Sequence, residues 1–180
     1  DKNTAYVMAE YENRPGELRS VKSSSYKDSL RIDGFATAGN YDITLYAVND
    51  GEIRSDPFKI VVSPREPPYR KMLKSLIVEP TFGGVIVSYD NPDTAALKVV
   101  LLTEDQGTDK LVESFGITSR SGRLVSRGFD SSQRKFGLFV RDRFGNYSDT
   151  LYTNITPLYE KQLDKGKFSE LNLAGDFNTP

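Results

Sequence analysis

The sequence predicts an all-β protein built from two tandem antiparallel β-sandwiches, the first of which lacks its first strands. Three observations carry this prediction: apolar and polar residues alternate with a period of two, turn-forming residues separate the alternating runs, and one pattern of strands occurs twice. A period of two places successive side chains on opposite faces of a strand, so each run is expected to bury one face. No helix is expected before residue 158.

The alternating runs are short and recur at intervals of about ten residues, a spacing typical of a β-sandwich. In the run 41–48, Tyr41, Ile43 and Leu45 fall on one face, and the runs 58–63 and 135–141 repeat the pattern. Segments rich in Gly, Pro, Asn, Asp and Ser separate the runs and are expected to form turns, at 13–16, 49–51, 90–93, 121–122 and 145–146.

An internal repeat defines the expected domain organisation. The segment that begins at Leu45 aligns with the segment that begins at Leu138, 93 positions later, and Ser55 aligns with Ser148 at the same offset. Between the copies lies a segment with three prolines in five residues, which favours a stiff, extended backbone. We therefore expect a partial module at 1–63, a linker at 64–69, a second module at 70–157 and a C-terminal connector at 158–180.

The second module is expected to open with strands near 73–78 and 85–89 that have no counterpart in the first. The strand expected at 97–102 corresponds to 5–10, and only four residues precede Ala5. The first two strands of the first module are therefore expected to lie outside this sequence.

The composition excludes several common kinds of chemistry. The chain has no His and no Cys, so a Ser-His-Asp triad, a thiol nucleophile and a Cys or His metal site are all excluded. We expect no catalytic residue, no bound metal and no cofactor, and a protein that is not an enzyme. A net charge of −1 without a long basic block argues against nucleic acid as a partner. No apolar run approaches the roughly 20 residues that a transmembrane helix requires.

The densest cluster of polar and aromatic residues lies at 141–147. If it binds a ligand, Phe144 and Tyr147 could offer ring faces to a sugar. Its hydroxyl groups would then bond to Asp142, to Asn146 and to the arginines of the cluster, Arg141 and Arg143. The alternative is a tight hairpin turn whose charged groups are simply solvated. The turn is the favoured interpretation, because 49–51 fills the same position in the first module without an equivalent aromatic pair.

Residues 30–49 and Ser55 resemble the second half of a fibronectin type III domain. In that family one strand reads Tyr-x-apolar-x-apolar-x-Ala-Val-Asn, as the run from Tyr41 to Asn49 does here. The resemblance implies that Tyr41 is a corner tyrosine, whose hydroxyl bonds to backbone upstream. Arg134 stands at the equivalent position of the second module, so a tyrosine corner is not expected there.

Residues 45–57 and 139–151 carry a more specific resemblance, together with 171–176. The tandem is similar to bacterial surface lipoproteins of unnamed-function families, encoded beside starch-utilisation-type glycan uptake systems. These combine fibronectin-like and immunoglobulin-like modules, often followed by a discoidin-like module, for which 171–176 resembles the lead-in.

This resemblance implies a non-enzymatic cell-surface module that spaces, presents or helps bind extracellular polysaccharide. It also implies an outer-membrane location, anchored through a missing N-terminal segment, with polysaccharide and other outer-membrane glycan uptake proteins as partners. A protein–protein interaction or cell-adhesion module without sugar affinity is the alternative, and an accessory fragment of a glycosidase is a third interpretation.

Overall fold

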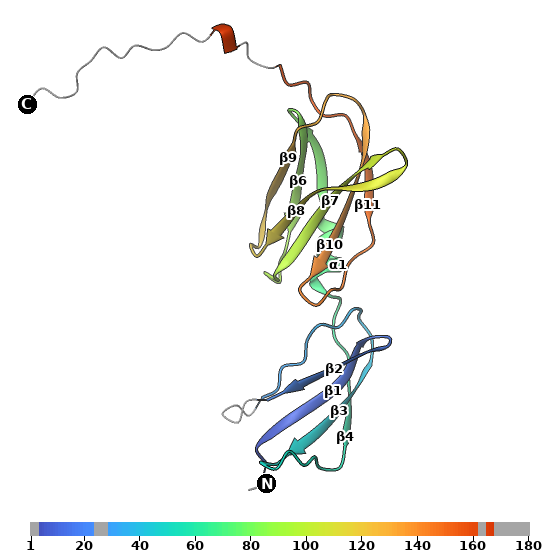
Figure 1. Cartoon of the computed structure of the whole chain (residues 1–180), viewed down its shortest axis with the longest axis vertical. Coiled ribbons are helices and arrows are strands. Elements are labelled where there is room, and N and C mark those ends of the chain that lie inside the picture. Colours follow the sequence, from blue (N-terminus) through green and yellow to red (C-terminus); the bar gives the residue numbers. More distant parts are fainter. Residues whose placement is uncertain (1–3, 24–28, 162–164, 168–180) are drawn as a thin grey trace, which may run out of the picture.

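A computed structural model describes residues 4–23, 29–161 and 165–167 of the chain. Figure 1 shows two β-modules placed end to end. We call residues 4–62 module 1 and residues 68–161 module 2. The architecture is all-β apart from one short α-helix and one 3₁₀ turn within the described residues.

Module 1 is a four-stranded antiparallel sheet with the strand order β2-β1-β3-β4. Ile43 on β3 stands opposite Tyr11 on β1 and Ile60 on β4, so the three side chains share one face. Leu30 and Phe35 pack against this face and help to form a small core. The strands are β1 (Tyr6–Arg14), β2 (Glu17–Lys22), β3 (Tyr41–Val48) and β4 (Phe58–Val62).

Module 2 is a complete sandwich of a four-stranded sheet, β11-β10-β7-β8, and a three-stranded sheet, β5-β6-β9. Its core lies between the sheets and buries Leu101 and Leu138 from one, Val85 and Val87 from the other. The elements are α1 (Pro68–Ser75), β5 (Ile77–Thr81), β6 (Gly84–Asp90), β7 (Leu97–Asp105), β8 (Thr108–Ile117), β9 (Ser121–Arg127), β10 (Arg134–Asp142) and β11 (Leu151–Ile155).

The predicted repeat is confirmed by the strand order. The sheet β2-β1-β3-β4 of module 1 corresponds to β8-β7-β10-β11 of module 2, and Leu45 stands opposite Ala9 as Leu138 stands opposite Leu101. The described residues of module 1 contain no counterpart to β5, β6 and β9. The chain is therefore a tandem of fibronectin III-like modules, the first of which lacks its first two strands and, among the described residues, a counterpart to β9 as well. Leu45 is accordingly only half-buried, where Leu138 is fully buried.

Helix α1 corrects the expectation of a strand near 73–78 and of no helix before residue 158. Tyr69, Met72, Leu73 and Leu76 recur at the spacing of one helix face, and the first two are almost completely buried. Pro68 favours a helix start at this point, because its missing N–H is not needed in the first turn and its φ is already helical. The helix thus begins inside the segment 64–69, where the prolines predict a linker.

The corner tyrosine implied by the resemblance is present. The Tyr41 hydroxyl donates to the carbonyl of Thr37 at 3.1 Å and accepts from the amide of Thr37 at 3.2 Å. In module 2, Arg134 stands at the position of the corner tyrosine and forms an ion pair instead. Its Nη2 lies 3.0 Å from Oδ1 of Asp130, which is four residues upstream, as Thr37 is from Tyr41. The Arg134 guanidinium also lies 5.1 Å from the ring centroid of Phe129.

After β11 the chain stays attached to module 2 for a few residues. The Leu158 amide donates to the carbonyl of Thr81 at 3.0 Å, and the Gly83 amide donates to the carbonyl of Leu158 at 2.9 Å. A 3₁₀ turn, η1 (Lys165–Lys167), is the last described element. The segment 171–176, expected to lead into a third module, lies outside the described residues.

Candidate functional site

The hairpin that joins β10 to β11 is closed by the side chain of Asp142. Its Oδ1 accepts the backbone N–H groups of Phe144 at 2.8 Å and Asn146 at 2.9 Å, and its Oδ2 accepts from Nδ2 of Asn146 at 2.9 Å. Gly145 has a φ of +83°, which glycine adopts without steric cost. The tight turn expected at this position is therefore present.

Module 1 closes its equivalent hairpin in the same way. Oδ1 of Asn49 accepts the backbone N–H groups of Gly51 at 3.0 Å and Ile53 at 2.9 Å. The offset of 93 that relates the two modules takes Asn49 to Asp142, so one side-chain oxygen organises each turn.

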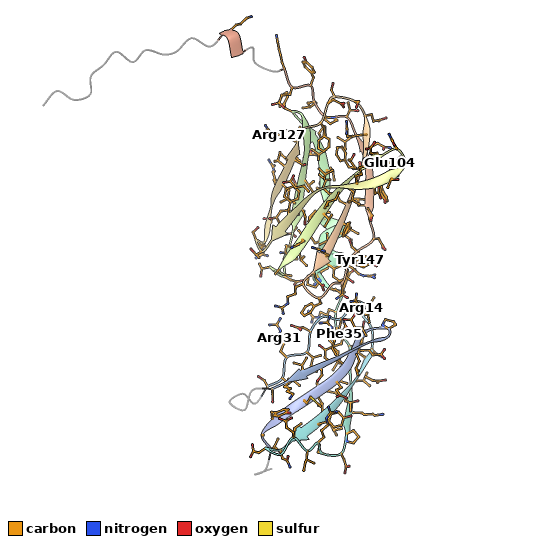
Figure 2. The ribbon with its side chains drawn as sticks, in the orientation of Figure 1. Arg14, Arg31, Phe35, Glu104, Arg127 and Tyr147 are labelled. Atoms are coloured by element: carbon orange, nitrogen blue, oxygen red, sulfur yellow. The ribbon has the colours of Figure 1, made fainter. Side chains whose placement is uncertain are left out.

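Phe144 docks the hairpin of module 2 onto module 1. It packs against Gly34, which has a φ of +88°. The ring atoms Cγ and Cδ1 of Phe144 lie 3.0 Å from the point that a Cβ on Gly34 would occupy. Only glycine allows both this backbone conformation and so close an approach of the ring. Figure 2 shows this junction, with Arg14, Arg31 and Phe35 of module 1 below Tyr147 of module 2.

Two buried asparagines meet at the same backbone carbonyl in this junction. Nδ2 of Asn146 donates to the carbonyl oxygen of Gly34 at 3.0 Å, and Nδ2 of Asn13 donates to it at 3.3 Å. Asn13 is 0% exposed and Asn146 is 3% exposed, so neither bond faces solvent competition. The loss of a buried partner of this kind costs about 1–3 kcal/mol.

Two arginines of module 1 also hold the hairpin. Nη2 of Arg19 donates to the carbonyl of Phe144 at 3.2 Å, with the guanidinium 5.5 Å from the ring centroid, and Nη1 of Arg14 donates to the carbonyl of Gly145 at 3.3 Å. The carboxylate of Glu17 forms ion pairs with both arginines. Its Oε2 contacts Nε of Arg14, and its Oε1 lies 2.9 Å from Nη2 of Arg19. These bonds lower the pKa of Glu17, Arg14 having the largest effect, so the carboxylate stays charged beside both arginines.

Contacts on the helix side complete the interface. The hydroxyl of Tyr69, which is 1% exposed, donates to the carbonyl of Ala36 in module 1. Nη2 of Arg143 lies 3.0 Å from Oδ2 of Asp33. The two modules are therefore joined by the hairpin, by α1 and by an ion pair, and not by the linker alone.

The four predicted site residues lie close together, and the hairpin and the interface occupy three of them. Asp142 holds the turn, Phe144 packs against Gly34, and Asn146 is buried in the interface. Tyr147 is 69% exposed and offers its ring to solvent. Within this cluster Tyr147 has the largest surface free for a ligand.

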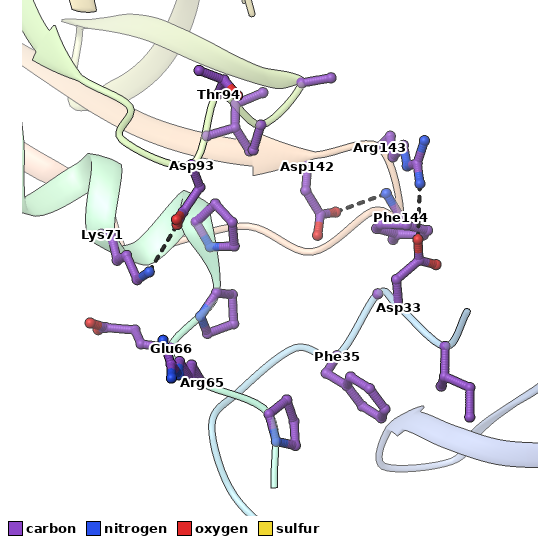
Figure 3. A pocket seen from close by; sticks show the side chains of 18 of the residues that line it. Asp33, Phe35, Arg65, Glu66, Lys71, Asp93, Thr94, Asp142, Arg143 and Phe144 are labelled. Atoms are coloured by element: carbon purple, nitrogen blue, oxygen red, sulfur yellow. Dashed lines mark hydrogen bonds and ion pairs between the residues drawn. The ribbon is translucent and has the colours of Figure 1, made fainter. Parts of the chain in front are cut away.

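A cleft of about 640 Å³ lies beside the hairpin, between the two modules. Figure 3 shows that Asp142 and Phe144 line it together with residues from module 1 and the linker. This volume is within the range of small-ligand sites, which commonly lie at domain boundaries. Sequence reasoning included Arg143 among the candidate sugar contacts but did not group it with the other charged residues of the cleft, which are Arg31, Asp33, Arg65, Glu66, Lys71 and Asp93.

The charges of this cleft are largely paired. Nζ of Lys71 lies 2.8 Å from Oδ2 of Asp93, and Asp33 pairs with both Arg31 and Arg143. Paired carboxylates and cations present acceptors and donors side by side, a chemistry suited to hydroxyl groups. No signal in the sequence could have grouped them, because they come from four separate segments and each segment alone has the composition of a solvated loop.

Among the described residues, no three or more His, Cys, Asp and Glu side chains come close enough to hold a metal ion. None of the described helices has the length and apolar character needed to cross a membrane.

Family models match both parts of the chain. One described as "Domain of unknown function (DUF5126)" matches residues 65–166, more than half of the chain, and one described as "Domain of unknown function (DUF4959)" matches residues 1–64. The resemblance of the tandem to families without an assigned function is thereby confirmed. The search of curated proteins found no match.

Solved structures of β-modules are similar to parts of the chain. A structure described as SusE-like protein BT2857 is 28% identical, with a TM-score of 0.47, over 54% of this chain and 34% of that chain. The FN1-FN3 domains of chicken CNTN1 are 11% identical, with a TM-score of 0.33, over 86% of this chain and 57% of theirs. The chain thus spans about a third of the first protein and just over half of the second.

Proposed function

The chain belongs to the family described as domain of unknown function DUF5126, and from this premise we propose that it is a non-enzymatic cell-surface module of a bacterial glycan uptake system. In this proposal it holds two β-modules in a fixed arrangement and presents the cleft between them to extracellular polysaccharide. The glycan uptake context comes from the sequence resemblance, and the mechanical role comes from the interface.

The buried hairpin contact is the observation that carries the mechanical role. Asn146 donates to the carbonyl of Gly34 while the ring of Phe144 packs against the same glycine. A freely moving hinge would break this hydrogen bond and this ring contact in each excursion, and the loss of the net hydrogen-bond energy and of the buried apolar contact opposes such movement. The prolines of the linker and the immediate start of α1 restrict the backbone as well. A module that sets distance and direction on a cell surface requires this kind of joint.

The balance of charge in the cleft supports a neutral, hydroxyl-rich ligand. Its lining contains four cationic and four anionic side chains, which gives no net attraction for a charged polymer. Pro64, Pro67 and Phe144 add apolar surface against which the carbon face of a sugar can pack. Arg65 has no ion-pair partner within the described residues and its donors are free for a ligand.

Affinity gel electrophoresis on a panel of soluble polysaccharides tests the sugar-binding part. The chain is expected to be retarded on at least one polysaccharide, and the cleft variants Arg65→Ala and Asp93→Asn are expected to weaken that retardation. Tyr147→Ala tests separately whether the exposed ring beside the cleft adds to binding. Lys59→Ala and Asp56→Asn are matched controls, because both residues are exposed and lie outside the cleft. Unchanged mobility on every polysaccharide would overturn sugar binding by this chain.

Small-angle X-ray scattering tests the spacing part independently. The chain is expected to have the dimensions of a single end-to-end arrangement, whereas Phe144→Ala together with Asn146→Ala is expected to broaden the distribution of distances. An equally broad distribution for the unaltered chain would refute the fixed joint.

A protein-interaction or adhesion module without sugar affinity is the second candidate. It is favoured by one observation, namely that the turn and the interface occupy Asp142, Phe144 and Asn146, three of the four residues predicted to contact a sugar. A fixed joint by scattering combined with no retardation on any polysaccharide is the result that would select it.

A further inference from the structure

The far end of module 2 carries a counterpart of the surface that receives Phe144 on module 1. Gly34 and Phe35 correspond to Gly128 and Phe129, 94 positions later. Both glycines have a positive φ, +88° and +98°. Phe35 packs on the ring of Tyr41 with a centroid distance of 4.5 Å, and Phe129 packs into the core of module 2. The same backbone turn therefore occurs at the equivalent end of each module.

The two glycines differ in the groups that lie against them. Phe144 stands 3.0 Å from the Cβ position of Gly34, whereas no atom of the described residues, its two chain neighbours aside, lies within 4 Å of the Cβ position of Gly128. The surface of module 1 is thus occupied by a hairpin, and no described residue takes the equivalent place on module 2, where Glu160 lies against the neighbouring Gly83.

Large exposed apolar side chains lie on the two segments that meet beside this glycine, 82–83 and 158–159. Phe82 is 58% exposed, Leu158 is 44% exposed and Tyr159 is 72% exposed. Phe82 and Leu158 form an isolated parallel β-bridge. The carbonyl of the next residue, Gly83, accepts hydrogen bonds from the N–H groups of Gly128 and Phe129, both at 3.0 Å. We call Phe82, Gly128, Leu158 and Tyr159 the far-end surface. Figure 2 places Arg127, which precedes Gly128, at the end of module 2 away from module 1.

The path of the chain brings the segment after β11 to this surface. In module 1 the chain leaves β4 through Pro64, and the module that follows lies against Gly34. In module 2 it leaves β11 through Pro157, at the offset of 93, and the bonds of Leu158 hold it beside Gly83. Figure 1 shows that the described residues that directly follow β11 lie at this end.

We propose that the far-end surface is the docking site for a further β-sandwich module of the same polypeptide, which seats an aromatic hairpin tip against Gly128. The docked module would present a turn like the one at 142–147. Its aromatic ring would pack against Gly128, and its side-chain amide would donate to the carbonyl of Gly128. At the interface between modules 1 and 2, Arg14 and Arg19 hold the hairpin by hydrogen bonds. At the far-end surface, Phe82, Leu158 and Tyr159 would hold the docked hairpin by apolar contact instead.

A second copy of this chain fits the surface poorly. Its hairpin at 142–147 is already engaged with its own module 1. Its other hairpin of this kind has Gly51 at the position of Phe144 and Ile53 at the position of Asn146, so it lacks both the ring and the amide.

Disulfide trapping tests the proposal, since the chain has no natural cysteine. The Cβ position of Gly34 lies 3.5 Å from Cβ of Phe144, within the range of a disulfide. The pair Gly34→Cys and Phe144→Cys is therefore expected to oxidise within one chain and serves as the positive control.

The test protein is the full chain to Lys161 followed by a second copy of residues 64–161 as the probe module. It carries Gly128→Cys in the first copy of module 2 and Phe144→Cys only in the added copy. The matched control replaces Gly128→Cys by Gly107→Cys, because Gly107 also has a positive φ, +77°, and open space around it. Peptide mass spectrometry after mild oxidation reads the cross-link.

The expected result is at least a tenfold higher cross-link yield with Gly128→Cys than with Gly107→Cys, reduced when Phe82→Lys and Leu158→Lys are added. Equal yields, or no cross-link in a protein whose circular dichroism shows all modules folded, would overturn the proposal. Size-exclusion chromatography with light scattering on the unextended chain provides a second readout. A dimer that Gly128→Arg abolishes would assign the surface to a second copy and also overturn it.

Discussion

The ring of Phe144 lies 3.0 Å from the point where a Cβ on Gly34 would stand, although the two residues are 110 positions apart and belong to different modules. A turn that each module uses to close a hairpin thereby becomes, in the second module, the contact that fixes the first. The turn of module 2 differs from that of module 1 in having the ring of Phe144 and the amide of Asn146. These two groups contact Gly34 on module 1 and so join the modules.

Gly34→Ala is expected to destabilise the chain more than Gly128→Ala does. Both alanines must adopt a positive φ, which costs on the order of 1 kcal/mol, but only the methyl group at residue 34 meets a ring. Chemical denaturation of the two variants compares the costs, and the difference between them isolates the joint. Equal losses of stability would show that Phe144 does not press on Gly34 in solution.

Leu138→Ala is expected to cost more than Leu45→Ala, although the two leucines are equivalent in the repeat. Leu138 is fully buried between two sheets, and its truncation is expected to cost about 2–5 kcal/mol. Leu45 is half-buried because no second sheet covers it among the described residues, so a smaller loss is expected. Thermal or urea unfolding of the two variants measures both. A larger loss for Leu45→Ala would contradict the difference in coverage between the modules.

The sequence predicted the features that repeat and the features that local patterns specify. The offset between Leu45 and Leu138 predicted two copies of one sheet, and the strand order confirms it. The motif around Tyr41 predicted a hydroxyl bond to upstream backbone, which is present at Thr37. These inferences succeeded because alternation and turn chemistry act within one strand or one hairpin.

Features that depend on two distant segments were not predicted. The cleft joins Asp33 and Asp93 from two loops with Lys71 from helix α1, and no spacing in the sequence brings them together. Helix α1 is a different case, because Tyr69, Met72 and Leu76 already have helical spacing in the sequence. The prolines before it obscure this signal, because they favour an extended linker as well as a helix start.

Tyr41→Phe is expected to destabilise module 1 by about 0.5–1.5 kcal/mol, the net value of a typical hydrogen bond. The change removes the hydroxyl that bonds Thr37 and leaves the ring contact with Phe35 in place. Tyr46→Phe is the matched control on the same strand, because no hydrogen bond to its hydroxyl is found in the described part of the chain. If both variants unfold at the same denaturant concentration, the corner has no energetic role here.

The acid stability of module 2 is expected to depend in part on Asp130. A hydrogen bond from the Ser132 hydroxyl, helped by the Ser132 amide at 3.0 Å and by Arg134, lowers the pKa of Asp130 from 3.8 to about 2. Because the folded-state pKa is below the unfolded one, the stabilisation is fully present above about pH 4 and is lost as the pH falls from 3.8 towards 2. Carboxyl titration by NMR measures the pKa directly, and Ser132→Ala is expected to raise it towards 3.8. Asp130→Asn is expected to flatten the dependence of unfolding on pH in that window, and a pH dependence that Asp130→Asn leaves unchanged would show that another carboxylate governs it.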